Sequence, residues 1–197
     1  MRALLAALLF TLAGTACTVH TAPPPETGEP APGGQQGTPP AGEQGAPPAA
    51  PTATGKCGAL PAGVGPSGKL NQWTAGLNCT GTGDIVISNA AIKIAGNGPT
   101  VLGSCDVTIT NSRIEAAVGA VLQGSGDILI RRSAITGATA ALQLMGSGDI
   151  TVEHSHIVGP VQILGSGDLV AKRSRFDGAL SITGTGEYKD GGNNCWQ

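Results

Sequence analysis

Aliphatic and polar residues recur along residues 77–190 with two superimposed spacings. Within each segment of about twenty residues, apolar positions alternate with polar ones, as they do along a short strand with one buried face. The pattern restarts after each acidic residue that follows a glycine-rich phrase. These acids are Asp84, Asp106, Asp127, Asp149, Asp168 and Glu187, at steps of 22, 21, 22, 19 and 19 residues. A period near twenty predicts a solenoid, in which each turn is stable only when stacked on its neighbours.

Alignment on the acidic residue predicts three short strands in each turn. Positions one and three after the acid share the inner face of the first strand. The first column is Ile85, Val107, Ile128, Ile150 and Leu169, and the second is Ile87, Ile109, Ile130, Val152 and Ala171. Positions six and eight predict a second inward pair, and the aliphatic residues before each glycine phrase predict a third. We therefore expect an all-β fold, a right-handed single-stranded parallel β-helix of about 5–6 short coils.

Two phrases carry a resemblance to known proteins. The segments 149–159 (DITVEHSHIVG) and 106–114 (DVTITNSRI) resemble the parallel β-helix repeats of pectate-lyase-like proteins. The recurrent Gly-Ser-Gly-Asp-Ile phrase is similar to the head domains of autotransporter adhesins, which are also β-solenoids. The resemblance covers about residues 77–190 and implies the architecture. It implies no single activity, because β-helix folds include lyases, hydrolases, adhesins and inert spacers.

The residues before the repeats divide into two segments. Residues 1–16 predict a signal peptide, with Arg2 at its start, an apolar run over 3–13 and small residues before Cys17. This resembles a bacterial lipoprotein signal, in which the cysteine after the cleavage site carries the lipid, although Gly14 stands where leucine is usual. We expect Cys17 to anchor the protein to a membrane, at the outer membrane or cell surface. Ordinary cleavage, giving a secreted or periplasmic protein, is the alternative.

Composition sets residues 17–56 apart from the rest of the chain. Ten of the 14 prolines lie between residues 23 and 51, and residues 18–56 contain no leucine, isoleucine or aromatic residue. Such a segment cannot bury enough apolar surface to offset its conformational entropy, so we expect a disordered tether. The β-helix domain should then occupy residues 57–197. Residues 57–76 and 188–197 depart from the repeat, and we expect them to cap its two ends.

Four cysteines lie within the predicted β-helix domain, and export favours disulfides between them. They are Cys57, Cys79, Cys105 and Cys195. Cys57 and Cys79 are one coil period apart, which favours a bridge between these two residues. Cys105 would then pair with Cys195 by elimination, or Cys195 would be a buried free thiol. The cysteine spacing does not match a zinc site.

The acidic ladder is the first candidate for chemistry. Carboxylates about 5 Å apart along one edge repel each other, so each must either cap a turn or share a calcium ion. Turn-capping is the preferred interpretation, and Asp106, Asp127, Asp149 and Asp168 are the calcium candidates. We expect no other cofactor. The neighbouring glycines should supply turn conformations that other residues resist, although Cys105 replaces one of them.

A basic cluster is the second candidate. Arg131, Arg132, Arg173 and Arg175, with Arg113, Lys172, His154 and His156, fall on columns near the corner between the first two strands. Such a cluster suits an acidic glycan of the cell envelope, and a solvated flank is the alternative. The net charge of −2 and charged fraction of 12% give no indication of nucleic-acid binding.

Two functions from different classes remain. The first is a non-enzymatic surface lipoprotein with a structural, adhesive or binding role, whose partners are the membrane and either a glycan or another protein. The second is a polysaccharide lyase or hydrolase, or a calcium-dependent glycan-binding protein. The connections between strands are short and no insertion interrupts the repeat, so a catalytic cleft is hard to build. We therefore expect the protein not to be an enzyme.

Overall fold

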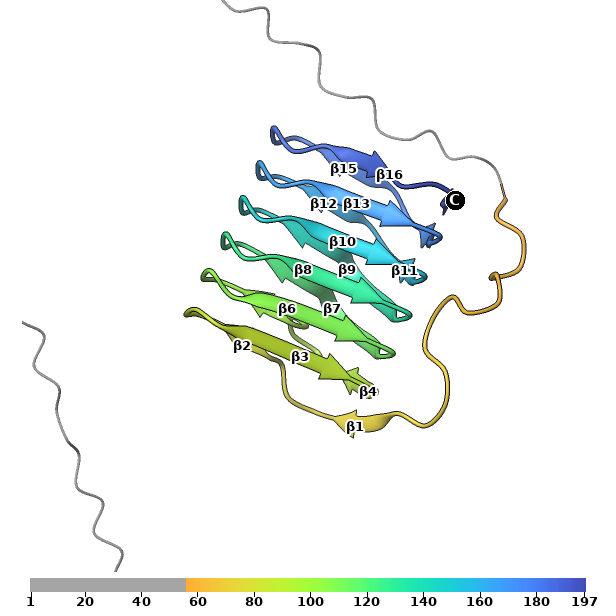
Figure 1. The fold of residues 1–197 in the computed structure, drawn as a ribbon, viewed down its shortest axis with the longest axis horizontal. Helices are drawn as coiled ribbons and strands as arrows, with labels where there is room; N and C mark the ends of the chain where they lie inside the picture. Colours follow the sequence, from red (N-terminus) through yellow and green to blue (C-terminus); the bar gives the residue numbers. More distant parts are fainter. Residues whose placement is uncertain (1–55) are drawn as a thin grey trace, which may run out of the picture. The chain divides into compact units, whose positions relative to one another are not determined.

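The computed structural model describes residues 56–197, and the predictions for the signal peptide, Cys17 and the tether lie outside this range. The described part contains strands and turns but no helix of a length and apolarity that would cross a membrane. Its strands wind into a parallel solenoid of about six turns (Figure 1). The all-β parallel β-helix expected from the repeat is thus confirmed.

A six-stranded parallel sheet forms one face of the solenoid. Its order is β16-β13-β10-β8-β6-β3, so each strand pairs with its equivalents in the coils before and after it. The strands are β3 (Asp84–Ser88), β6 (Asp106–Thr110), β8 (Ile128–Arg131), β10 (Ile150–Glu153), β13 (Leu169–Lys172) and β16 (Tyr188–Asp190). Their register aligns Ile85 with Val107, Val107 with Ile128, and so on along the column.

The second and third strands of the coils belong to one 11-stranded sheet. The second strands are β1 (Asn71–Trp73), β4 (Ala90–Lys93), β11 (His156–Val158), β14 (Arg175–Asp177) and β17 (Cys195–Trp196). The third strands are β2 (Asn78–Cys79), β5 (Thr100–Val101), β12 (Val161–Ile163) and β15 (Leu180–Ile182). In two middle coils the second and third strands are continuous, as β7 (Arg113–Leu122) and β9 (Ala134–Leu144). These two strands pair with each other, and their register shifts between Ala116 and Val118.

The expectation of three separate strands therefore fails in these two middle coils. Pro99 precedes β5 and Pro160 precedes β12, and a proline has no N–H to continue a ladder. Neither β7 nor β9 contains a proline. The break between β14 and β15, at Gly178 and Ala179, occurs without one.

The predicted inward columns form a continuous core. Ile87, Ile109, Ile130, Val152 and Ala171 have no exposed surface, and the column at position eight is at most 2 % exposed. That column continues beyond the repeats in both directions, because Trp73 pairs with Ile92 and Trp196 pairs with Phe176 in register. A stack of aliphatic side chains from neighbouring coils supplies most of the stabilisation, at about 1.5–3 kcal/mol per buried side chain.

A ladder of buried serines makes the corner between the first two strands. Each serine hydroxyl donates to the carbonyl two residues earlier and accepts the backbone N–H of the equivalent residue in the preceding coil. The N–H of Ser133 donates to Ser155 Oγ over 3.1 Å, and Ser155 Oγ donates to the Glu153 carbonyl over 2.7 Å. Ser112 and Ser174 make the same pair of bonds. The serines therefore satisfy backbone groups that the corner takes out of the sheet.

The glycines of the opposite corner are needed for close approach rather than for unusual dihedral angles. A Cβ on Gly124 would lie 1.8 Å from the carbonyl oxygen of Gly103 in the preceding coil, and one on Gly146 would lie 1.9 Å from that of Gly124. Among the glycines of these phrases, positive φ occurs at Gly83. The expectation that these glycines supply turn conformations that other residues resist therefore holds for Gly83, whereas in the other coils the stacked backbones exclude side chains.

Residues 57–70 form a strap along the outside of the solenoid, from its last coil back to its first (Figure 1). Gly65 N–H donates to the His154 carbonyl, and Ser67 and Asn111 exchange two hydrogen bonds of 2.7 and 2.9 Å. The strap then leads into β1. The expectation that residues 57–76 cap the N-terminal end is therefore wrong for residues 57–70.

The two disulfides are Cys57–Cys195 and Cys79–Cys105. The first joins the strap to the last coil. The favoured Cys57–Cys79 pair, the Cys105–Cys195 pair and the free Cys195 thiol are all wrong. One coil period does not bring Cys57 beside Cys79, because the strap carries Cys57 to the last coil. The Cα atoms of Cys57 and Cys195 lie 5.9 Å apart, and those of Cys79 and Cys105 lie 6.3 Å apart in adjacent coils.

Candidate functional site

The basic residues lie on the corner that the serine ladder supports, and the strap passes over the same corner. Arg131 ends β8, Arg175 begins β14, and Arg132 and Arg173 occupy the corner between the sheets. Arg113 begins β7, Lys172 ends β13, and His154 and His156 follow the same columns. We call these residues the basic corner. Its assembly follows from the register, in which His156 pairs with Arg175 and Glu153 pairs with Lys172.

The corner residue of every coil adopts a left-handed backbone conformation. The φ values are 45° at Arg132, 49° at His154 and 50° at Arg173. The outer coils have asparagine at this position, at Asn89, Asn111 and Asn193. Asparagine tolerates this region, whereas a long side chain adopts it at a cost of about 1 kcal/mol or more. Three coils therefore carry basic side chains at a position where asparagine would be easier to accommodate.

Two hollows lie between the strap and the basic corner. The larger has a volume of about 470 Å³ and is lined by Gly63, Arg131, Arg132, Glu153 and His154. The smaller, of about 110 Å³, lies where the strap meets the last coils, beside Arg173, Arg175 and the Cys57–Cys195 bridge. Both hollows are open to solvent and neither encloses a small molecule, so they suit the side of a chain-like ligand better than a buried substrate.

The arginines of the basic corner differ in how far they are neutralised. Arg131 Nε lies 2.9 Å from Glu153 Oε2, which pairs this guanidinium with a carboxylate inside the larger hollow. Within residues 56–197 no carboxylate lies at ion-pair distance from Arg132 or Arg173. Both side chains are exposed. The larger hollow thus combines an unpaired guanidinium, a paired one and a histidine.

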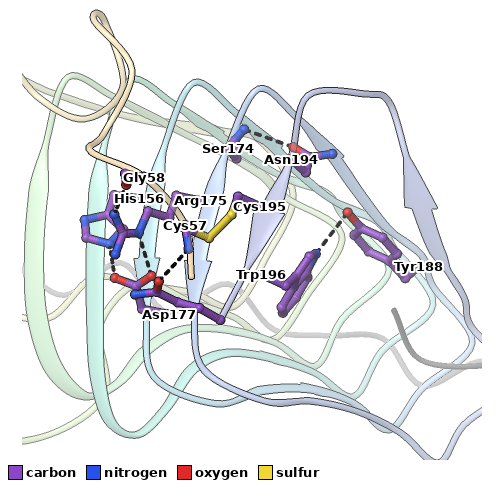
Figure 2. Close-up of a disulfide and its surroundings, with 11 residues drawn as sticks. Cys57, Gly58, His156, Ser174, Arg175, Asp177, Tyr188, Asn194, Cys195 and Trp196 are labelled. Atoms are coloured by element: carbon purple, nitrogen blue, oxygen red, sulfur yellow. Dashed lines mark hydrogen bonds and ion pairs between the residues drawn. A yellow bond between two sulfur atoms is a disulfide. The ribbon is translucent and has the colours of Figure 1, made fainter. Parts of the chain in front are cut away.

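Arg175, His156 and Asp177 form a half-buried network that holds the strap (Figure 2). Arg175 Nε donates to Asp177 Oδ1 over 2.6 Å, and His156 Nε2 lies 2.7 Å from Asp177 Oδ2. Arg175 also donates to the carbonyl of Gly58, over 2.9 Å. Partial burial acts to raise the pKa of Asp177, but the bonds and charges of Arg175 and His156 outweigh it and lower the pKa. Arg175 and His156 are therefore engaged in structure rather than free for a ligand.

The aspartates of the ladder cap the backbone of the next coil. Asp106, Asp127 and Asp149 each accept, through Oδ1, the N–H of the following acid over 2.8 Å, and Asp168 accepts that of Glu187 over 3.0 Å. Turn-capping, the preferred interpretation of the ladder, is confirmed for these four residues. Lys189 bonds Asp168, and this bond and charge, against an opposing contribution from partial burial, lower the pKa of the carboxyl group.

Calcium at the ladder stays a prediction. Residues 56–197 contain no group of three or more histidine, cysteine, aspartate or glutamate side chains placed to hold a metal ion. One oxygen of each candidate is already used by a backbone N–H. A calcium ion would have to bind the remaining oxygens of successive carboxylates, with water completing its coordination.

Sequence reasoning did not identify the strap or its contacts. Asn111, Ser67 and Gly58 carry no pattern that the repeat alignment could expose, because the strap follows no period. The asparagine at the corner position of the outer coils was a usable signal for left-handed geometry.

The family comparison agrees with the fold. The family described as "Right handed beta helix region" matches residues 70–186, which is most of the described solenoid. No curated protein and no solved structure matches the chain. The family includes enzymes as well as proteins without enzymatic activity, so the match leaves the activity open.

Proposed function

Because the chain belongs to the right-handed β-helix family, we propose that it is a non-enzymatic lipoprotein anchored to the cell surface, with a β-helix that serves a structural, adhesive or binding role. The sequence of residues 1–17 supports the lipid anchor at Cys17. The proline-rich residues 18–56 support a tether between the anchor and the domain. In this proposal the β-helix is held away from a bacterial membrane and binds a cell-envelope glycan or a protein.

One observation supports the binding role over catalysis. The ladder carboxylates, His156, Arg175 and the corner serines are used to hold the fold together, which leaves Arg132, Arg173 and His154 among the polar side chains of the basic corner that are free within residues 56–197. The ladder aspartates bond backbone N–H groups, His156 and Arg175 bond Asp177, and Ser133 and Ser155 are fully buried in the serine ladder. A general base needs a free lone pair within reach of substrate, and a nucleophile needs an accessible oxygen.

The larger hollow favours an acidic glycan as the alternative ligand class. Arg132 and His154 line it without an acidic partner in the described residues, and guanidinium groups bind carboxylates through paired hydrogen bonds. The second candidate function is therefore calcium-dependent binding of such a glycan, or its cleavage by a polysaccharide lyase or hydrolase.

Two measurements test this proposal. Mass spectrometry of the mature protein should show a diacylated or triacylated N-terminal Cys17, and Cys17→Ser should abolish membrane association while leaving the domain folded. Acidic oligosaccharides should be titrated into the protein in a calorimeter, with and without calcium, and the sugars should then be analysed. The mixture should contain no unsaturated or reducing-end products. If the protein releases such products, and a folded variant of the protein does not, the non-enzymatic assignment is overturned. An unmodified Cys17 would overturn the anchor.

A further inference from the structure

The N-terminal end of the solenoid lacks one strand. The first coil contains β1 and β2 but contributes nothing to the six-stranded sheet, so β3 is the edge of that sheet. At the opposite end, the coil that contains β17 also contains β16, which pairs with β13. The residues that would precede β1 in this sheet belong instead to the strap. The described part of the chain therefore leaves a strand-sized position open beside β3.

The open position is lined by unpaired backbone groups. In this sheet the N–H of each acidic residue faces the preceding coil, as Asp106 N–H does toward the Gly83 carbonyl. The N–H and carbonyl groups of alternate residues face the same way in a parallel strand. For β3 these residues are Asp84, Val86 and Ser88, and β6 is the one strand of the described chain that pairs with β3. Val86 is 65 % exposed.

Charge specifies one residue of the missing strand. The N–H groups of Asp127, Asp149 and Asp168 are each bound by the carboxylate of the preceding coil over 2.8 Å. The N–H of Asp84 has no such carboxylate within the described residues. An acidic side chain at the equivalent place of an added strand would cap this N–H, as the carboxylates of four coils do in the same molecule. The N–H of Asp106 bonds the Gly83 carbonyl instead of the Asp84 carboxylate.

The indole of Trp73 specifies a second residue. Trp73 and Trp196 end the same core column, but Trp73 is 38 % exposed whereas Trp196 is 5 % exposed. Trp196 stacks on Phe176 with ring centroids 4.0 Å apart and meets the edge of Tyr188, which β16 supplies. The strand missing at the other end is the counterpart of β16. An apolar residue directly after its acid would cover the core end beside Trp73.

We propose that the N-terminal end of the β-helix binds an extended segment of a partner protein, which adds as a parallel strand beside β3. The segment has an acidic residue followed at the first and third positions by apolar residues. This inference deepens the proposed binding function and rests on it. A second copy of the chain is less suited, because its own segments of this pattern are already paired within its coils. The Cys57–Cys195 bridge places Cys57 beside the last coil, at the end of the solenoid opposite β3.

The test uses the full chain and a synthetic peptide with the sequence of residues 146–153, GSGDITVE, which reproduces the glycine phrase, the acid and the first strand of one coil. The matched control peptide has lysine in place of its aspartate. Binding should slow amide hydrogen exchange at Asp84, Val86 and Ser88 by about tenfold or more, since these amides become bonded. It should also change the fluorescence of Trp73, and Trp73→Phe should remove that change. The lysine peptide should do neither.

Two variants of one residue sharpen the test. Val86→Pro removes the outward N–H while sparing the ladder to β6, so it should abolish peptide binding. Val86→Thr keeps the N–H and should bind as the parent does. Unchanged amide shifts in β10 to β16 show that each variant is folded. Protection absent from β3, or equal binding by Val86→Pro, overturns the inference. Concentration-dependent self-association blocked by Val86→Pro overturns the partner assignment in favour of a second copy. A lipidated Cys17 with no peptide binding refutes this inference and leaves the anchor intact.

Discussion

The two ends of this solenoid are built from the same repeat but are finished in different ways. At the C-terminal end, Trp196 lies between Phe176 and Tyr188, and the strap is attached through Cys57–Cys195. The N–H of Cys57 also donates to Gln197 Oε1 over 3.0 Å. At the N-terminal end, β1 pairs with β4 and Trp73 is partly exposed, and no strand of residues 56–197 pairs with the outer edge of β3.

The difference shows how a repeat protein separates stability from binding. In a stack each coil depends on its neighbours, so an end that lacks one neighbour is the first place to open or to bind. Residues 57–70 are cross-linked to the last coil through Cys57–Cys195, and among the described residues no strand pairs with the outer edge of β3.

Removal of the Cys57–Cys195 bridge should have the largest effect on this difference. Its loop of 138 residues predicts about 5 kcal/mol of stabilisation by chain entropy, against about 3.5 kcal/mol for the 26-residue loop of Cys79–Cys105. The double variant Cys57→Ser with Cys195→Ser should therefore lower the free energy of unfolding more than Cys79→Ser with Cys105→Ser. Urea denaturation of both variants measures this. Equal losses would mean that the strap is not an effective cross-link.

The tryptophans at the two ends provide the next comparison. Trp196→Ala should cost about 3–5 kcal/mol, because it removes a buried ring from an aromatic stack. Trp73→Ala should cost less, because Trp73 is 38 % exposed and Trp196 is 5 % exposed. Thermal unfolding followed by circular dichroism gives both values. A larger loss for Trp73→Ala would show that the N-terminal end is the better packed of the two.

Substitution of glycines in one column should change the stability by different amounts at the two ends of the solenoid. A Cβ on Gly184 would lie 1.9 Å from the Gly165 carbonyl oxygen, whereas a Cβ on Gly81 would meet nothing within 4 Å. Gly184→Ala should destabilise the domain by about 1–3 kcal/mol. Gly81→Ala should be neutral or slightly stabilising, since alanine restricts the unfolded chain. Denaturation midpoints check the pair, and a loss at Gly81 would place an undetected neighbour beside the first coil.

Most of the fold could be predicted from the sequence because a solenoid repeats its own constraints. Each column recurs in five coils with one residue type or class predominating, so one substitution, such as Cys105 in the place of a glycine, does not hide the period. The continuous strands β7 and β9 were missed because the alignment shows which residues face inward and not whether the backbone ladder continues between the second and third strands. The same alignment could not locate the strap, since residues 57–70 occur once and have no column to join.

The position of the basic corner could be predicted from the sequence, but which of its arginines are paired with an acid could not. The register places the basic corner on one edge once the columns are known. Whether an arginine is free depends on acids from other coils and on the strap. Arg131 is paired through Glu153 of the next coil, and Arg175 is held by Asp177 and Gly58. These contacts depend on side-chain direction and on a non-repetitive segment, which a column of residue types does not contain.

The smallest expected effect is a pH dependence of the strapped end. The folded-state pKa of Asp177 is lowered, so its contribution to stability is complete above the unfolded pKa of about 4 and is lost as the pH falls below it. Protonation weakens the bond that orients Arg175 toward the Gly58 carbonyl. Because the pair is partly solvated, the loss should not exceed about 1 kcal/mol.

Urea midpoints at pH 5 and pH 2.5 measure this loss, with Asp177→Asn as the matched control. The parent should lose more stability than the variant over this range, since asparagine does not titrate. Amide exchange should locate the difference in residues 57–65 and not in β3, because the N-terminal end lacks an equivalent ion pair among the described residues. An identical pH response in Asp177→Asn would assign the effect to other carboxylates, of which Asp168 with its Lys189 partner is the first to examine.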